Sequence, residues 1–213
     1  HLIDTYIDAS ESRKISPFDD IGLLDLIVKT GIAKSIADRL QGFKGNRTAI
    51  AETIENNIRA KIVKEHLNDP AYYSQMSAIL DELIKFRKEQ ADRYEEYLKG
   101  IAELARNVQT GKNDDTPEAL NTDGRRALYN NLLPRSSAGS GVSEPPKAYG
   151  KNEQENALQL ALKIDETIKH VRPDGWRGIH AREQVIKGAL YGILQDEDEV
   201  ERIFLIIKQQ KDY

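Results

Sequence analysis

The chain has 213 residues, of which 31% are charged and 39% hydrophobic, and its formal net charge is -4. This composition is typical of long exposed helices, and its slight acidity excludes a protein coated in basic surface, so any contact with nucleic acid must be local. No apolar run approaches the roughly 20 residues of a membrane span, and the absence of cysteine excludes disulfides and thiolate metal sites. We therefore expect a cytoplasmic protein that does not enter the membrane.

The chain begins at His1 rather than at a methionine, and its first residues look like an element cut from something larger. Residues 1–15 alternate loosely between apolar and polar side chains, which is typical of a short strand or of an extended lead-in from a preceding domain. We expect an excised piece, which need not contain the chemistry of its parent.

Residues 16–133 have the pattern of a main helical bundle. Ser16-Pro17 begins a helix that is apolar on nearly every side and stops at Gly31, so we expect it deep in the core. A short helix follows over 32–40.

Three longer amphipathic helices fill residues 46–109, with breaks at Asp69-Pro70 and near Asp92. A continuous rod through 90–92 is the alternative to the second break. Apolar residues three and four apart form one stripe on each helix, and each stripe must bury against another. The stripes contain Ile50, Ile54, Ile58, Ile62, Val63 and Leu67; Tyr72, Met76, Ile79, Leu80, Leu83 and Phe86; and Tyr94, Tyr97, Leu98, Ile101, Leu104, Ala105 and Val108.

The rest of the chain divides at a segment rich in serine, glycine and proline. Thr116-Pro117-Glu118 predicts the start of a helix that ends near Leu133. Residues 134–150 predict a linker or an exposed loop, because they bury little apolar surface to offset chain entropy. Residues 151–213 predict a C-terminal helical part packed on the bundle, with helices near 152–171, 180–194 and 196–211, and with Val185 among the inward residues. The expected fold is all-α.

No pattern in the chain predicts catalysis. The histidines at 1, 66, 170 and 180 lack metal-ligand spacing, and carboxylates adjacent on a helix point about 100° apart, so they do not converge on one atom. Phosphate-binding glycine loops and nucleophile elbows are also absent from the sequence. We therefore expect no catalytic residue, no metal site and no cofactor in this part of the protein.

Two polar features favour contact. Asn56, Asn57 and Arg59 interrupt an otherwise apolar-periodic helix, and because asparagine is a poor helix former, they indicate hydrogen bonds to a neighbouring segment or contact with a partner. The second feature is a basic segment with a tryptophan in its turn, which fits contact with nucleic-acid phosphates. The alternative is structural: the tryptophan seals a helix junction and the arginines cap helix ends. The candidate residues are Lys169, Arg172, Trp176, Arg177, Arg182 and Lys187.

The chain resembles the C-terminal helical region of type I restriction enzyme R subunits, which are the restriction and motor subunits. The resemblance rests on an ordered set of segments that covers nearly the whole chain outside 134–150. These are Ser16-Pro17-Phe18-Asp19-Asp20 with 23–28, 51–59, Asn68-Asp69-Pro70-Ala71-Tyr72-Tyr73, Met76-Ser77, Tyr97-Leu98, Asp174-Gly175-Trp176-Arg177, 200–204 and Gln210-Lys211-Asp212-Tyr213.

The resemblance implies a part of a larger assembly. In that family the nuclease and the ATP-driven translocase lie upstream, so the parent would be an ATP- and Mg²⁺-dependent site-specific deoxyribonuclease. The helical region would hold the R subunit on the methyltransferase and specificity subunits, which recognise the DNA sequence. It would be non-catalytic itself, and it would meet DNA through the parent complex or directly through the basic segment.

Overall fold

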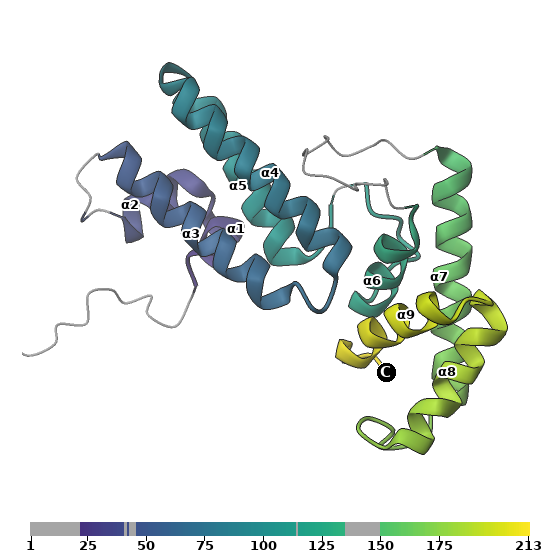
Figure 1. Ribbon diagram of the computed structural model, residues 1–213. Helices are drawn as coiled ribbons and strands as arrows, with labels where there is room; N and C mark the ends of the chain where they lie inside the picture. The colour runs from purple at the N-terminus through teal and green to yellow at the C-terminus, as the bar shows by residue number, and fades with distance from the viewer. Residues whose placement is uncertain (1–21, 41, 43–45, 114, 135–149) are drawn as a thin grey trace, which may run out of the picture.

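The structure is a computed structural model that describes residues 22–40, 42, 46–113, 115–134 and 150–213 (Figure 1). Within these ranges the regular elements are all helices, which confirms the predicted all-α fold. None of the described helices is long and apolar enough to cross a membrane. The predicted lead-in over 1–15 and nearly all of the predicted linker over 134–150 lie outside the described residues.

The first five helices share one hydrophobic core. They are α1 (Leu23–Thr30), α2 (Ile32–Arg39), α3 (Arg47–Glu65), α4 (Pro70–Glu89) and α5 (Tyr94–Thr110), and the paired α4 and α5 extend furthest from the rest in Figure 1. Four residues of α1 are buried, as its nearly continuous apolar pattern predicted; these are Leu23, Leu24, Leu26 and Ile27. The isoleucine row of α3 and the apolar stripes of α4 and α5 meet in the same core.

The helix boundaries in this part follow local signals in the sequence. The side chain of Asn46 caps α3 by accepting a hydrogen bond from the amide of Ala49 at 3.1 Å, and Asp69 caps α4 through the amide of Tyr72 at 3.2 Å. A 3₁₀ turn over Ala91–Arg93 separates α4 from α5. The break predicted near residue 92 is therefore confirmed, and the continuous rod is wrong.

Two residues that the sequence placed in the stripe of α3 lie outside it. Val63 is 70% exposed and Leu67 is 67% exposed. Val63 follows Ile62 by one residue, which turns its side chain about 100° away from the buried row. Leu67 lies beyond the end of the helix at Glu65, so the helical spacing no longer governs its direction.

The last four helices share a second core. They are α6 (Asp123–Leu132), α7 (Lys151–Val171), α8 (His180–Leu194) and α9 (Glu197–Gln209), and Figure 1 shows them as a group beside the first five helices. Their buried side chains include Leu128, Ile164, Ile168, Ile186 and Ile203. Val185, which was predicted to point inward on α8, is 49% exposed. Ile186 and Leu190 face the core instead, and Val185 comes one residue before Ile186, which turns its side chain about 100° away.

The structure corrects the predicted position of α6. The helix begins at Asp123 rather than near Pro117, because the hydroxyl of Thr122 caps it by accepting from the amide of Arg125. The prediction also assigned 116–133 to the first bundle. In the structure Ala127 and Leu128 lie in the second core, so the two groups divide before α6 and not at 134–150.

Truncation of Leu128 tests the burial of the apolar side of α6. We expect Leu128→Ala to lower the free energy of unfolding by about 2–5 kcal/mol, because the side chain is fully buried in the second core. Urea denaturation followed by circular dichroism measures this loss. The matched change Leu205→Ala, at a side chain that is 58% exposed, should shift stability by less than about 0.5 kcal/mol. Equal effects of the two changes would contradict the burial of Leu128.

Candidate functional site

A buried carboxylate joins the two helical groups. Asp69, between α3 and α4, accepts hydrogen bonds from the side-chain amides of Asn130 and Asn131 on α6, each at 2.7 Å. Asn131 in turn accepts from the amide of Ala71 at 3.3 Å. A second contact runs from the side chain of Gln210 to the carbonyl of Asn68 at 2.6 Å. The joint is therefore polar, whereas each group is apolar inside.

The environment of Asp69 shifts its protonation. Burial raises the pKa of its carboxyl to about 7, and hydrogen bonds from Asn130, the amide of Tyr72 and Asn131 offset only part of that rise. Asp69 thus titrates near neutral pH while it holds the α6 asparagines.

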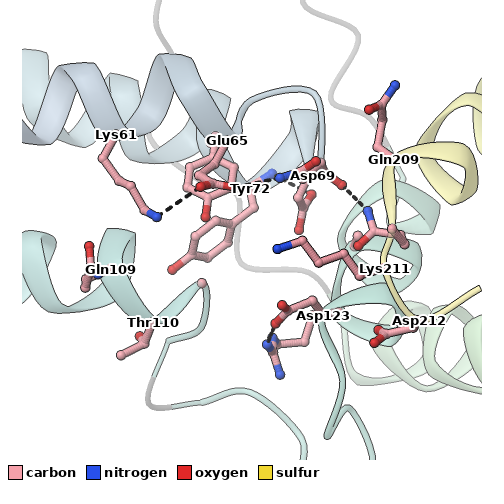
Figure 2. A pocket seen from close by; sticks show the side chains of 16 residues that line it. Lys61, Glu65, Asp69, Tyr72, Gln109, Thr110, Asp123, Gln209, Lys211 and Asp212 are labelled. Carbon is pink, nitrogen blue, oxygen red and sulfur yellow. Dashed lines mark hydrogen bonds and ion pairs between the residues drawn. The ribbon is translucent and has the colours of Figure 1, made fainter.

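A cleft of about 260 Å³ lies beside this joint. Figure 2 shows Lys61 and Gln109 on the side of the first helical group, with Lys211 and Asp212 on the other. Many of its polar groups already bind protein: Lys61 pairs with Glu65 at 3.0 Å, and Asp212 accepts from the amide of Gly124 at 2.8 Å. The cleft is therefore part of the joint between the two helical groups. Among the described residues, no cluster of three or more histidine, cysteine or acidic side chains is arranged to hold a metal ion.

Each core contains one buried acidic centre that the sequence did not reveal. In the first, Glu55 accepts from Arg87 Nε at 2.8 Å and from the hydroxyl of Tyr97 at 2.8 Å, which ties α3 to α4 and α5. Hydrogen bonding and charge from Glu55 raise the pKa of Arg87, although burial alone would lower it. The sequence predicted contacts from the neighbouring Asn56 and Asn57, but the buried glutamate beside them makes the contact between helices.

The acidic centre of the second core is Asp165 of α7, which is fully buried. It accepts from Arg125 at 2.7 Å and from the hydroxyl of Tyr213 at 2.9 Å, and it pairs with Lys169 at 2.8 Å. Burial alone would raise the pKa of Asp165, but hydrogen bonds from Lys169, Arg125 and Tyr213 outweigh it and lower the pKa. This centre ties α6, α7 and the C-terminus together.

The candidates on α3 lie on its outer side. The side-chain amide of Asn57 donates to the carbonyl of Thr53 in the same helix at 2.8 Å, and Asn56 is exposed. The predicted bonds from the asparagines to a neighbouring segment are therefore wrong, because both side chains point away from α4 and α5. Arg59 does reach another helix and pairs with Asp81 of α4 at 2.7 Å. Contact of these residues with a partner stays a prediction.

The basic segment around Trp176 has the contacts of the structural alternative. Trp176 is 3% exposed and packs against Phe204, with ring centroids 5.8 Å apart. Arg177 lies over the Trp176 ring and donates to the carbonyls of Lys208 and Gln210, where α9 ends. Trp176 therefore seals the junction between the turn and α9.

The other basic candidates also have partners within the chain. Arg172 donates to the carbonyl of Asp212 at 3.2 Å, and Arg182 donates to that of Asp174 at 2.7 Å. The remaining two lysines pair with carboxylates, Lys169 with Asp165 and Lys187 with Glu201. Each of these basic side chains therefore stabilises a contact within the chain. Binding of DNA by the segment stays a prediction.

A different surface stands out on α8. From residue 184 onward, its exposed positions fall on one side of the helix, at the spacing i, i+1, i+4, i+7 and i+8, and none is charged. We call this surface the α8 face; it consists of Gln184, Val185, Gly188, Tyr191 and Gly192. Its large side chains are open to solvent, since Val185 is 49% exposed and Tyr191 is 50% exposed. The exposed side of the neighbouring α7 is charged by contrast, with Glu153, Lys163 and Glu166.

Comparison with known proteins adds no assignment. No protein family, curated protein or solved structure was found to match this chain.

The pH dependence of stability tests the joint at Asp69. In an unfolded chain this carboxyl titrates near 4, whereas in the folded chain its pKa is about 7. Between these values only the folded state holds the proton, so its stabilising effect is complete below about pH 4 and is lost as pH rises through 7. From about pH 5 to about pH 8 we expect the free energy of unfolding to fall by about 1–3 kcal/mol more in the natural chain than in Asp69→Asn.

Urea denaturation at the two pH values gives this difference directly. The control is Asp81→Asn, at an exposed carboxylate on α4, which should keep the pH dependence of the natural chain. An unchanged slope in Asp69→Asn would show that this carboxyl is not the titrating group.

The glycines of the α8 face generate a second prediction. A Cβ added at Gly188 or Gly192 meets no atom within 4 Å, and both glycines are inside a helix, where glycine is unfavourable. We expect Gly188→Ala and Gly192→Ala each to raise the free energy of unfolding by roughly 0.5–1 kcal/mol. Thermal unfolding measures the gain, and Gly124→Ala is the contrasting control. There a Cβ would come within 2.9 Å of the Tyr213 ring, so this change should destabilise the chain.

Proposed function

We propose that this chain is a non-catalytic helical docking region of a type I restriction enzyme R subunit. Its task is to hold the ATP-dependent translocase and nuclease of that subunit on the methyltransferase and specificity subunits, in the cytoplasm. The α8 face is the observation that carries the docking role. Exposed large apolar side chains such as Val185 and Tyr191 are typical of surfaces that bind other macromolecules.

The contacts made by the resembling segments support the same proposal. Asn68-Asp69-Pro70 supplies the buried carboxylate of the joint, and Gln210 of the closing segment bonds back to Asn68. Asp174-Gly175-Trp176-Arg177 supplies the ring that seals the second core and the arginine that binds the end of α9. The segments behind the resemblance thus hold the helices together in this chain. The resemblance therefore concerns the helical architecture of this chain. Under this proposal, the catalytic chemistry belongs to the upstream domains of the parent protein.

Direct binding of DNA is the weaker candidate. Phosphate contact requires cations that are free to reach the backbone. Arg172, Arg177 and Arg182 donate to backbone carbonyls of their own chain, so binding a phosphate would compete with these contacts.

Co-elution tests the proposed function. The chain is mixed at micromolar concentration with the methyltransferase and specificity subunits encoded in the same genome, and the mixture is passed over a gel-filtration column. We expect a complex that elutes earlier than either component. Each component run alone is the control, and repetition at high salt separates apolar contact, which persists, from screened charge contact. Absence of a complex at these concentrations would overturn the proposal.

A further inference from the structure

The two helical groups meet at one narrow polar contact. Their hydrophobic cores share no residue. Among the described helices, α4 and α6 are the one pair from different groups that packs together extensively, and the chain passes from the first group to the second once, between α5 and α6. A small polar interface lets two bodies move relative to one another, whereas a large apolar one holds them fixed.

The buried side chains at this joint are polar. Asn131 donates to Asp69 and to the carbonyl of Ala127, and its oxygen accepts from the amide of Ala71, so its orientation is fixed. Gln210 is buried as well and donates to the carbonyl of Asn68. Figure 2 shows Asp69 at the edge of the cleft between the groups, so a small separation of the groups would bring water to its carboxyl.

The carboxyl of Asp69 has no ion pair with any described residue. Arg126 of α6 is the cation whose charge acts on it, but this guanidinium pairs with Asp123 and donates to the carbonyl of Leu120. The remaining titratable groups that line the cleft around Asp69 are Glu65 and Lys61 of α3, which pair with each other, Tyr72 and Tyr73 of α4, and Lys211 and Asp212 of the C-terminal tail. An ionised Asp69 is therefore held by amide donors alone, and burial of its charge is costly.

The protonated carboxyl, by contrast, can stay inside the joint. Its proton needs an acceptor, and Asn130 can supply one, because a half turn of its amide presents the oxygen in place of the nitrogen that now faces Asp69. Asn131 cannot turn in this way without losing its bonds to Ala71 and Ala127. Loss of the proton leaves a buried negative charge that water stabilises once the groups separate.

We propose that the joint at Asp69 is a pH-sensitive contact, which closes the two helical groups on each other while the carboxyl holds a proton and releases them when the proton is lost. Each group keeps its own core in both states, because the bonds of Glu55 and of Asp165 lie within their groups. This movement requires no partner protein, so it is independent of the proposed docking role.

The direction of the pH effect follows from the two states of the carboxyl. Burial raises the pKa of Asp69 to about 7 in the closed joint, whereas a carboxyl exposed by opening titrates near about 4. The proton therefore favours the closed state fully below about pH 4, and this advantage is lost as pH rises through 7. From about pH 5.5 to about pH 8, the ratio of open to closed molecules should rise by roughly tenfold or more.

Spin labels on the complete chain test the proposal. The natural sequence has no cysteine, so introduced cysteines are the only sites of labelling. Lys88→Cys with Glu166→Cys, at exposed positions on α4 and α7, places one label on each group, and Lys88→Cys with Glu103→Cys places both on the first group as the control. Pulsed electron paramagnetic resonance at about pH 5.5 and about pH 8 measures the distances between labels. We expect the α4–α7 distances to shift and broaden at the higher pH, and the α4–α5 distances to stay the same.

Three substitutions in the α4–α7 labelled chain assign the effect to the joint. Asp69→Asn replaces the titrating carboxyl with a neutral amide of the same shape, so the distances should be equal at both pH values. Its matched control, Asp81→Asn at an exposed carboxylate of α4, should keep the shift. Asn131→Ala removes two bonds across the joint and should give the open distances already at about pH 5.5.

Circular dichroism at both pH values checks that each chain keeps its helices. A shift between the groups that Asp69→Asn abolishes supports the proposal. Equal α4–α7 distances at both pH values overturn it, and so does a shift that persists in Asp69→Asn or that the α4–α5 pair shows to the same extent. If Asp69→Asn does not fold, Asn131→Ala decides, because closed distances retained by that variant at low pH would also overturn the proposal.

Discussion

The arrangement of this protein depends on a buried carboxylate held by two amides. Asp69 lies between α3 and α4 and binds Asn130 and Asn131, which lie 61 and 62 residues further along the chain. The helix α6 can make this contact because its apolar side, with Ala127 and Leu128, is already buried against the second core. Its polar side is then left to face α4. One short helix thus belongs to one core and anchors the other.

The two cores repeat one physical solution. Each is an apolar interior that contains one buried acidic side chain, Glu55 in the first and Asp165 in the second. Each acid accepts hydrogen bonds from an arginine and from a tyrosine hydroxyl. Burial of a charge is costly unless it is paired and hydrogen-bonded, and both acids meet this condition. They set how the helices of each core sit against one another. This suits the proposed docking role, because a docking surface must keep one shape.

The surface is uneven in a way that fits such a role. Most helices expose charge along their length, whereas from residue 184 onward α8 exposes Val185, Tyr191 and two glycines. The basic residues that were predicted to contact nucleic acid, such as Arg172, Arg177 and Lys169, instead bind carbonyls and carboxylates of the chain itself.

The sequence by itself determined the helical fold and many helix limits, because these follow from interactions between residues three or four apart. The isoleucine row of α3, the cap at Asp69 and the break near residue 92 are of this kind. The exposure of Val63 and Val185 was not predictable in that way, because one residue of rotation on a helix separates core from solvent and only the neighbouring helices select the buried side. The grouping of α6 and the roles of Glu55, Asp69 and Asp165 were decided by tertiary structure alone. Their partners lie between 32 and 62 residues away, apart from Lys169 and the local cap at Tyr72, and packing of the helices is what brings them together.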